Sequence, residues 1–396
     1  MIRYLIRIGF PVMMKLRKAV SILIFFLIPF SGSRACDTLH LPGLKSSVEV
    51  LRDKWGVNHI YANNEHDLFF AQGYCAAKDR LFQFEIWRRQ ATGTVAELTG
   101  PSDLKRDMGA RLFRYRGNLQ KELNHYHPRG VAIITAFVNG INSYVDEVVN
   151  NPQLLPIEFT MLGMLPGKWT PEVVISRHQG LLGNIEEELS MGRAVAIAGA
   201  DKVKDLVWFH PKEPDLKLDA SITSAMLSEN ILELYTEYRS RFPHRKLMLK
   251  DTSSAQKWQE AEIDLLSNNL RKEAERLPAH QDADGSNNWI VSGSRTESGY
   301  PILANDPHRS VAMPSLRYMV HLVAPGWNVI GAGEPSIPGV SIGHNEFGAW
   351  GLTIFETDGE DLYVYDLNPK NLAQYKYKDR WLTMSEEQTS LSAKGI

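Results

Sequence analysis

Hydrophobic and polar positions change their period several times along the chain, and each change predicts a different element. Residues 48–53 alternate enough for a strand, and Ile60-Tyr61 after the following glycine turn predicts its hairpin partner. Over residues 67–90 the apolar positions recur at three- and four-residue steps, which predicts an amphipathic helix. Residues 131–149 predict a second helix, which ends at Asn150-Asn151-Pro152.

The pattern shifts after Pro214. From there to residue 284 the chain mixes charged and apolar residues and contains no glycine, which indicates a helical, solvated connector. Beyond Gly285 the chain turns to β-branched and glycine-rich runs of strand length. These runs are residues 289–291, 301–303, 318–323 and 329–330. We therefore expect a sheet to begin directly after the connector.

Composition narrows the class of protein. The chain has 396 residues, of which 43% are hydrophobic and 23% charged, and these values are ordinary for a globular protein. The net charge is −2, so no basic surplus favours a nucleic acid partner. The two cysteines, Cys36 and Cys75, are too few for a disulfide framework or a zinc site and form one bridge at most. Cys75 lies in a helical pattern, where a small core residue is the usual finding.

The first 35 residues resemble an export signal. Three basic residues within 15–18 precede the apolar run 19–30, which is too short to span a membrane, and small residues lead to cleavage after Ala35. We expect a periplasmic or secreted protein. Two alternatives stay open: an uncleaved anchor that starts nearer the N-terminus, and a lipid on Cys36, which Arg34 just upstream disfavours.

Two serine patterns have specific weaknesses. Ser254 begins an S-x-x-K sequence, but no S-D-N or K-T-G motif follows it and it lies in the connector. Ser341 is the serine of a G-x-S-x-G sequence, the nucleophile elbow of α/β-hydrolases, which needs a helix after the serine. The next residues contain two glycines and no helical period, and His344 is the last histidine of the chain.

Ser286 offers different chemistry at the border between connector and sheet. If the bond from Gly285 to Ser286 is cut, Ser286 gains an α-amino group with a pKa of about 8, which can act as the base for its own hydroxyl. Gly285 suits this role because a residue without Cβ lets the serine oxygen approach the preceding carbonyl. The local sequence leaves the alternative of a polar turn open.

Longer motifs carry a resemblance to a known family. From Val48 to about Asn368, outside the connector, the chain resembles the precursors of the penicillin acylase family of N-terminal nucleophile hydrolases. The matching segments are Gly73-Tyr74, residues 79–83, 286–289, 291–296, 303–308, 338–340, 343–345, 350–353 and 361–363.

The resemblance implies a fold, an activity and roles for residues. The fold would be α+β, a four-layer αββα sandwich with a mainly helical first subunit. Residues 1–35 would be the signal, 36–214 the first subunit, 215–285 a removed spacer and 286–396 the start of the second subunit. The activity would be hydrolysis of linear amides of small N-acyl compounds through an acyl-enzyme on Ser286. His308 and Ile354 match positions that contribute to the oxyanion pocket, although a structural turn after Asp306-Pro307 is an alternative for His308.

The resemblance also implies a calcium site. Asp358, Glu360 and Asp361 form an acidic cluster, and Glu188 matches the glutamate that the first subunit supplies in the family. Carboxylates with a backbone carbonyl suit a hard cation such as calcium. The alternative is a solvated acidic loop, because Glu186 and Glu187 show that acidic residues are common in this region.

The length of the chain after Ser286 departs from the family pattern. Ser286 to Ile396 is several times shorter than the family's second subunit and lacks its downstream oxyanion asparagine, so we expect a fragment or a disrupted gene that is inactive by itself. The rival function is a catalytically inactive, calcium-stabilised surface or binding protein. We expect no protein partner beyond the protein's own two processed subunits. Relatives handle penicillins, cephalosporins and acyl-homoserine lactones, so the sequence leaves the substrate open.

Overall fold

The computed structural model describes residues 38–177, 184–209, 212–240, 242, 247, 286–308, 313–353 and 359–395. The chain divides into two units, Met1–Pro42 and Gly43–Ile396, and residues 38–42 of the first contain no helix or strand. The predicted signal therefore lies outside the described residues. Across the described part of the chain, no helix has the length and apolar character needed to cross a bilayer.

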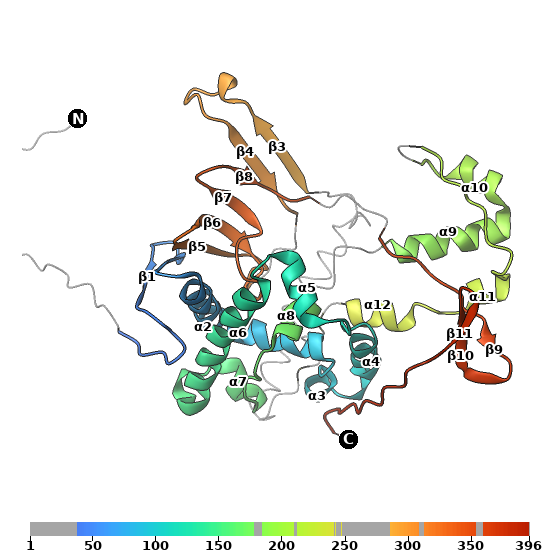
Figure 1. The fold of residues 1–396 in the computed structure, drawn as a ribbon, viewed down its shortest axis with the longest axis horizontal. Helices are drawn as coiled ribbons and strands as arrows, with labels where there is room; N and C mark the ends of the chain where they lie inside the picture. Colours follow the sequence, from blue (N-terminus) through green and yellow to red (C-terminus); the bar gives the residue numbers. More distant parts are fainter. Residues whose placement is uncertain are drawn as a thin grey trace, which may run out of the picture. The chain divides into compact units, whose positions relative to one another are not determined.

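The second unit contains both helices and sheets (Figure 1). Its α-helices are α2 (Glu65–Thr92), α3 (Ala96–Thr99), α4 (Leu104–Leu112), α5 (Leu119–Tyr126), α6 (Gly130–Asn150), α7 (Ile157–Leu162), α8 (Pro171–Arg177), α9 (Ile185–Ala198), α10 (Ala200–Leu206), α11 (Ser224–Ser228) and α12 (Glu233–Arg239). Short 3₁₀ turns are η2 (Pro101–Asp103), η3 (Pro152–Leu154) and η5 (Gly293–Arg295). The long helices α2 and α6 confirm the two helices that the period predicted.

The strands form three sheets. They are β1 (Val48–Arg52), β2 (Asn58–Ala62), β3 (Asn287–Val291), β4 (Ile302–Asp306), β5 (Tyr318–Ala324), β6 (Trp327–Gly333), β7 (Ile342–Asn345), β8 (Ala349–Trp350), β9 (Leu367–Asn368), β10 (Asn371–Tyr377) and β11 (Arg380–Thr383). The largest sheet has the order β1-β2-β5-β6-β7-β8, while β3 pairs with β4 and β10 lies between β9 and β11. The predicted hairpin and the predicted sheet after the connector are confirmed, and the chain is α+β.

One strand pair joins distant parts of the sequence. β2 runs parallel to β5, with Asn58 opposite Val320 and Ile60 opposite Leu322. Because β2 precedes the connector and β5 follows it, the main sheet is built from both sides of the connector. The four-layer sandwich stays a prediction.

The predicted amphipathic character of α2 is wrong. The helix is buried on several faces, and its buried residues include Asp67, Gln72 and Glu85 as well as its aromatic side chains. Each polar group has a partner: Glu85, for example, accepts hydrogen bonds from Arg88, Arg89 and the backbone N–H of Gly167. Polar residues with such partners can be buried at little cost, so α2 lies inside the unit instead of at its surface.

Two glycines bring α2 and α6 into close contact. A Cβ atom on Gly73 would lie 2.0 Å from the carbonyl oxygen of Phe137, and one on Gly140 would lie 1.9 Å from that of Phe70. Any larger residue at either position would separate the two helix backbones. Figure 1 shows α2 and α6 side by side next to the main sheet.

The start of the predicted solvated connector is packed against the first half of the chain. Tyr235 of α12 is 7% exposed, and the ring of Tyr238 stacks on Phe113 with 5.1 Å between centroids. Arg106 of α4 donates to the carbonyl oxygen of Ser240 at 2.8 Å. The expectation of a solvated segment is therefore wrong for α12, because its tyrosines supply apolar surface that α4 covers. Residues 248–285 lie outside the described residues.

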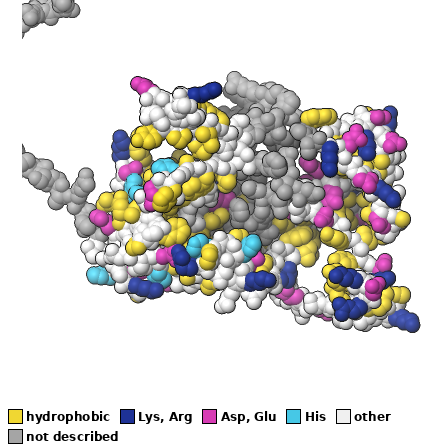
Figure 2. All heavy atoms as spheres, turned by 45° about the horizontal axis from the view of Figure 1, so that its top comes forward, with side chains coloured by type: hydrophobic (Ala, Val, Ile, Leu, Met, Phe, Trp, Pro, Cys, Tyr) yellow, Lys and Arg dark blue, Asp and Glu magenta, His cyan; other side chains and the backbone are white. Residues whose placement is uncertain are grey.

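Charged side chains of both signs lie close to one another on the face drawn in Figure 2. Figure 2 shows lysine and arginine next to aspartate and glutamate on the face in view, with hydrophobic side chains between them. This distribution agrees with the near-neutral net charge of −2 and supplies no support for a nucleic acid partner.

Candidate active site

The β3–β4 hairpin positions Ser286. The register pairs Asn287 with Asp306, so Ser286, one residue earlier, lies beside the segment that follows β4. The backbone N–H of His308 donates a hydrogen bond to Ser286 Oγ at 3.1 Å. The His308 ring is oriented by Asp306, whose Oδ2 lies 2.9 Å from Nε2. The structure thus brings Ser286 and His308 together, whereas Gly285 and Ile354 lie outside the described residues.

Asn305 connects this hairpin to a distant segment. Its side-chain nitrogen donates to the carbonyl oxygens of Asn287 and Leu352, each at 3.1 Å, and its side-chain oxygen accepts from the N–H of Leu352 at 3.2 Å. Gly351 leaves room for this amide, since a Cβ there would lie 2.6 Å from Asn305 Cγ. Sequence reasoning missed this role, although Asn305 and Gly351 both lie in segments that carried the resemblance.

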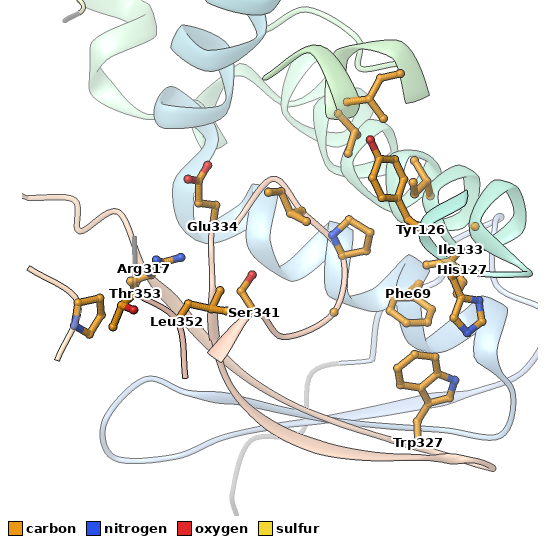
Figure 3. Close-up of a pocket in the computed structure, with 18 of the residues that line it drawn as sticks. Phe69, Tyr126, His127, Ile133, Arg317, Trp327, Glu334, Ser341, Leu352 and Thr353 are labelled. Atoms are coloured by element: carbon orange, nitrogen blue, oxygen red, sulfur yellow. The ribbon is translucent and has the colours of Figure 1, made fainter. Parts of the chain in front are cut away.

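Ser286 borders a cavity of about 440 Å³ (Figure 3). A volume of 300–1,000 Å³ is usual for sites that hold small molecules. Most of the wall is apolar or aromatic, with a few polar groups. The lining residues that matter below are Phe69, Tyr126, His127, Ile133, Trp327, Pro338, Gly339, Ser341, Leu352 and Thr353. Figure 3 shows Phe69, His127 and Trp327 at one end, and Leu352, Thr353 and Arg317 at the other.

Gln72 fixes one wall of this cavity. Its side-chain amide donates to the carbonyl oxygen of Gly339 at 3.0 Å and accepts from the N–H of Gly339 at 2.9 Å. A pair of bonds to the N–H and the C=O of one residue fixes both the distance and the orientation of the backbone at that residue. The sequence contained no signal for Gln72, because its partner lies 267 positions away.

Ser341 lines the same cavity but does not lie in a nucleophile elbow. The residues after it form β7, and His344 of β7 pairs with Ala349 of β8. An elbow requires a helix directly after the serine, so this structure contradicts the reading of Ser341 as an α/β-hydrolase nucleophile. Ser254 lies outside the described residues.

Asp361, one of the candidate calcium ligands, bonds to a neighbouring phenol. Tyr363 donates to Asp361 Oδ2 at 3.2 Å, and the negative charge of Asp361, followed by this hydrogen bond, raises the pKa of Tyr363. Glu188 of α9 is the last and weakest of the causes that raise this pKa. Carboxylate oxygens are of the ligand type that calcium prefers.

The Glu360 carboxylate is bonded to Tyr235 of α12. Both of its side-chain oxygens accept from Tyr235 Oη, at 3.0 and 2.8 Å, while its carbonyl oxygen accepts from Asn184 Nδ2 at 2.9 Å. Within the part of the chain that is described, no three His, Cys, Asp or Glu side chains are grouped closely enough to hold a metal ion. Asp358 lies outside the described residues.

Comparison with known proteins defines the family. A family model described as penicillin amidase matches residues 47–396. Since this match spans most of the chain, the chain belongs to the penicillin amidase family. The resemblance found in the sequence motifs is thereby confirmed.

Individual relatives are moderately similar. The chain is 30% identical to penicillin acylase 2 proenzyme of Pseudomonas sp. (strain SE83), over 85% of this chain and 39% of the relative. It is 28% identical to the acyl-homoserine lactone acylase QuiP of Pseudomonas aeruginosa, over 90% and 39%. A solved structure of thermostable penicillin G acylase from Alcaligenes faecalis is 27% identical, over 44% of this chain and 98% of that one, with a TM-score of 0.37. The chain spans about two fifths of the length of the curated relatives it matches.

Proposed function

We propose that the full-length protein containing this chain is an exported hydrolase of linear amides that uses Ser286 as its nucleophile. The observation that carries the proposal is the position of Ser286 Oγ, which borders an apolar cavity and accepts a hydrogen bond from the backbone of His308. Family membership supports the same chemistry, because the relatives are named as penicillin and acyl-homoserine lactone acylases.

The first step would be cleavage of the bond between Gly285 and Ser286. This cleavage gives Ser286 an α-amino group, which is about half unprotonated near pH 8 and can then take the proton from its own hydroxyl. The N–H of His308 already points at this oxygen, so it would stabilise negative charge as the proton leaves. The printed name of one relative, a proenzyme, agrees with maturation by cleavage.

Acyl transfer would follow in two steps. Ser286 Oγ attacks the carbonyl carbon of the amide, the C–N bond breaks, and the proton taken by the α-amine passes to the departing amine. Water then attacks the resulting ester and releases the acid and the free hydroxyl. Donors to the tetrahedral oxyanion are each worth about 3–4 kcal/mol, and we assign this role to the backbone of His308 and Ile354.

The substrate would be a small N-acyl compound whose acyl group enters the cavity. The wall next to Ser286 is mainly apolar, so burial of an acyl chain there is favourable at about 25 cal/mol per Å². The amine part of the substrate would leave through the open side of the site. The surface charge gives no reason to expect a nucleic acid partner.

Calcium would be bound by Glu188, Asp361 and Asp358, with Glu360 contributing its backbone carbonyl. The bonds between Asn184, directly before α9, and the backbone of Gly359 and Glu360 hold the helix of Glu188 next to the segment of Asp361, which supports the first two ligands. The engagement of the Glu360 carboxylate by Tyr235 favours the carbonyl at that residue. The ion would stabilise the contact between α9 and the 359–361 segment, and it supplies no reacting group.

Substitution of each cavity serine tests the proposal. In the full-length protein, Ser286→Ala should abolish both processing and hydrolysis of an N-acyl anilide, because it removes the nucleophile. Ser341→Ala is the matched control and should still be processed, since Ser341 leads into β7. A Ser286→Ala protein that matures and hydrolyses normally would show that the nucleophile lies elsewhere. An unprocessed, inactive wild-type protein would favour the rival function of a binding protein.

A further inference from the structure

Trp327 lines one end of the cavity, and its side chain is held by contacts with α2 and with Arg129. It begins β6 directly after a two-residue turn, Pro325-Gly326, in which Gly326 has φ +82°. Proline followed by a glycine with positive φ is the signature of a type II turn, so the start of β6 is fixed by the backbone. Figure 3 shows the Trp327 ring at the opposite end of the cavity from Leu352 and Thr353.

The indole is held by an ion pair between two helices. Trp327 Nε1 donates to Glu65 Oε2 at 2.9 Å. Glu65 in turn accepts two hydrogen bonds from Arg129, from Nε at 2.8 Å and from a terminal nitrogen at 2.6 Å. A two-pronged arginine–carboxylate pair fixes orientation as well as distance. The Arg129 guanidinium, together with the bond from Trp327, keeps the pKa of Glu65 below its ordinary value despite partial burial.

Aromatic contacts hold the Trp327 ring in addition to the hydrogen bond of its N–H group. Phe69 meets it in an edge-to-face contact with 5.1 Å between ring centroids, and His127 lies 6.2 Å away on another side. Phe69 is 1% exposed and lies one helical turn after Glu65 on α2, so both residues face Trp327. The ring cannot rotate aside without breaking a hydrogen bond and an aromatic contact.

A rigid wall opposite the nucleophile determines which acyl groups fit. The cavity of about 440 Å³ is within the range of about 300–1,000 Å³ that is usual for drug-sized ligands, which is far more than an acetyl group needs. An extended acyl chain attached at Ser286 would run along Ile133 and Pro338 toward Trp327. In such a pocket each additional methylene changes discrimination by about 10–200-fold, so the wall sets the preferred length.

We propose that Trp327, positioned by Glu65 and Arg129, sets the length of the acyl chain that this protein hydrolyses. This inference rests on the proposed function, because it needs an acyl group on Ser286. It assigns Trp327 as the residue that touches the end of the chain. Glu65 and Arg129 are positioning residues, which act only through the indole.

The experiment is an acyl-length profile of the matured full-length protein. The probes are p-nitroanilides of acetic, hexanoic, decanoic and tetradecanoic acid, and the readout is the ratio of kcat/KM for the longest and the hexanoyl probe. Trp327→Ala should raise this ratio about tenfold or more, because the pocket is extended. Trp327→Phe should shift it less in the same direction. Glu65→Gln should also raise it, since the indole is held less firmly.

Controls separate this inference from the proposed function. Trp55→Ala makes the same truncation at a tryptophan that is 80% exposed on the β1–β2 turn, and it should leave the ratio unchanged. A wild-type protein that hydrolyses neither these probes nor the p-nitroanilide of phenylacetic acid would overturn the proposed function and the inference with it. One that hydrolyses only the phenylacetyl probe would overturn the inference alone. A wild-type protein that hydrolyses the straight-chain probes, while Trp327→Phe and Trp327→Ala keep its ratio, would also overturn the inference alone. If Trp327→Ala does not fold, the result with Trp327→Phe decides.

Discussion

At the scale of single residues, small side chains control the geometry around Ser286. Gly351 is covered by the Asn305 carboxamide, and that amide bonds both to the strand that carries the serine and to Leu352. Any displacement of Asn305 therefore moves the serine and the segment before Ile354 relative to each other. A misplacement of about 1 Å in an active site can cost about 10²-fold in rate.

We expect Gly351→Ala to lower kcat/KM about 10- to 100-fold in the full-length protein, because the new methyl group displaces Asn305. Gly348→Ala is the matched control, since a Cβ there meets no atom within 4 Å and its activity should stay within about twofold of wild type. Steady-state assays with one acyl anilide measure both. Equal activities of the two variants would mean that the Asn305 bridge does not position the site.

Several residues that carried the family resemblance turn out to act in packing. Gly73 permits the close approach of α6, and Asp79 accepts hydrogen bonds from Arg52, Asn58 and Tyr318. A motif shows that these residues are characteristic of the family, but only the structure shows which partner each one has. Asn305 illustrates the reverse case, in which a motif residue holds the site together.

At the scale of elements, the hydrophobic pattern predicted the helices and hairpins, whose residues lie close together in the sequence. The periods predicted α2, α6 and the strands after residue 286 because helices and hairpins form from neighbouring residues. The parallel pairing of β2 with β5 was not predictable, since it depends on strands more than 250 residues apart. The same limit applies to the burial of α2, whose polar residues look solvated until Gln72 and Glu85 are seen with their partners.

The contact of α2 with α6 through Glu65 and Arg129 predicts a pH dependence of stability. Arg129 lowers the pKa of Glu65 from its ordinary 4.5. A carboxyl group with a lowered pKa contributes stability that is fully present above 4.5 and is lost as the pH falls through the lowered value. Glu65→Gln should therefore be less stable than wild type at neutral pH, and the difference should shrink as the pH falls below 4.5 and through the lowered pKa.

Urea unfolding of the full-length protein between pH 3 and pH 7 measures this difference. Glu346→Gln, a substitution of an exposed glutamate in the β7–β8 turn, is the control and should leave the curve unchanged at every pH. A difference between Glu65→Gln and wild type that persists undiminished at the acid end would exclude the ion pair as its source.

At the scale of the whole molecule, segments far apart in the sequence meet at the candidate calcium ligands. Asn184, directly before α9, bonds to the backbone of Gly359 and Glu360, and the candidate ligand Glu188 lies on the same helix. An ion here would tie α9 to the chain after residue 359. Binding of an ion to the folded state alone stabilises it according to its concentration.

Removal of calcium should lower the melting temperature or the yield of maturation of the full-length protein, and it should leave the reacting groups intact. At a calcium concentration of 100 times Kd the expected gain is about 2.7 kcal/mol. Melting curves with excess chelator and with added calcium test this, with Asp361→Asn as the variant that should lose the response and Glu186→Gln as the control. Identical melting curves in chelator and calcium would favour the solvated acidic loop.

The most direct test of the account is the site of acylation. The matured full-length protein is mixed with an acyl anilide, quenched in acid during turnover, digested and analysed by mass spectrometry. We expect a peptide that begins at Ser286 with a free α-amino group and carries the acyl mass on its hydroxyl. The Ser286→Ala protein should yield no such peptide. An acyl group on Ser341, or acylated Ser286 still joined to Gly285, would contradict the account.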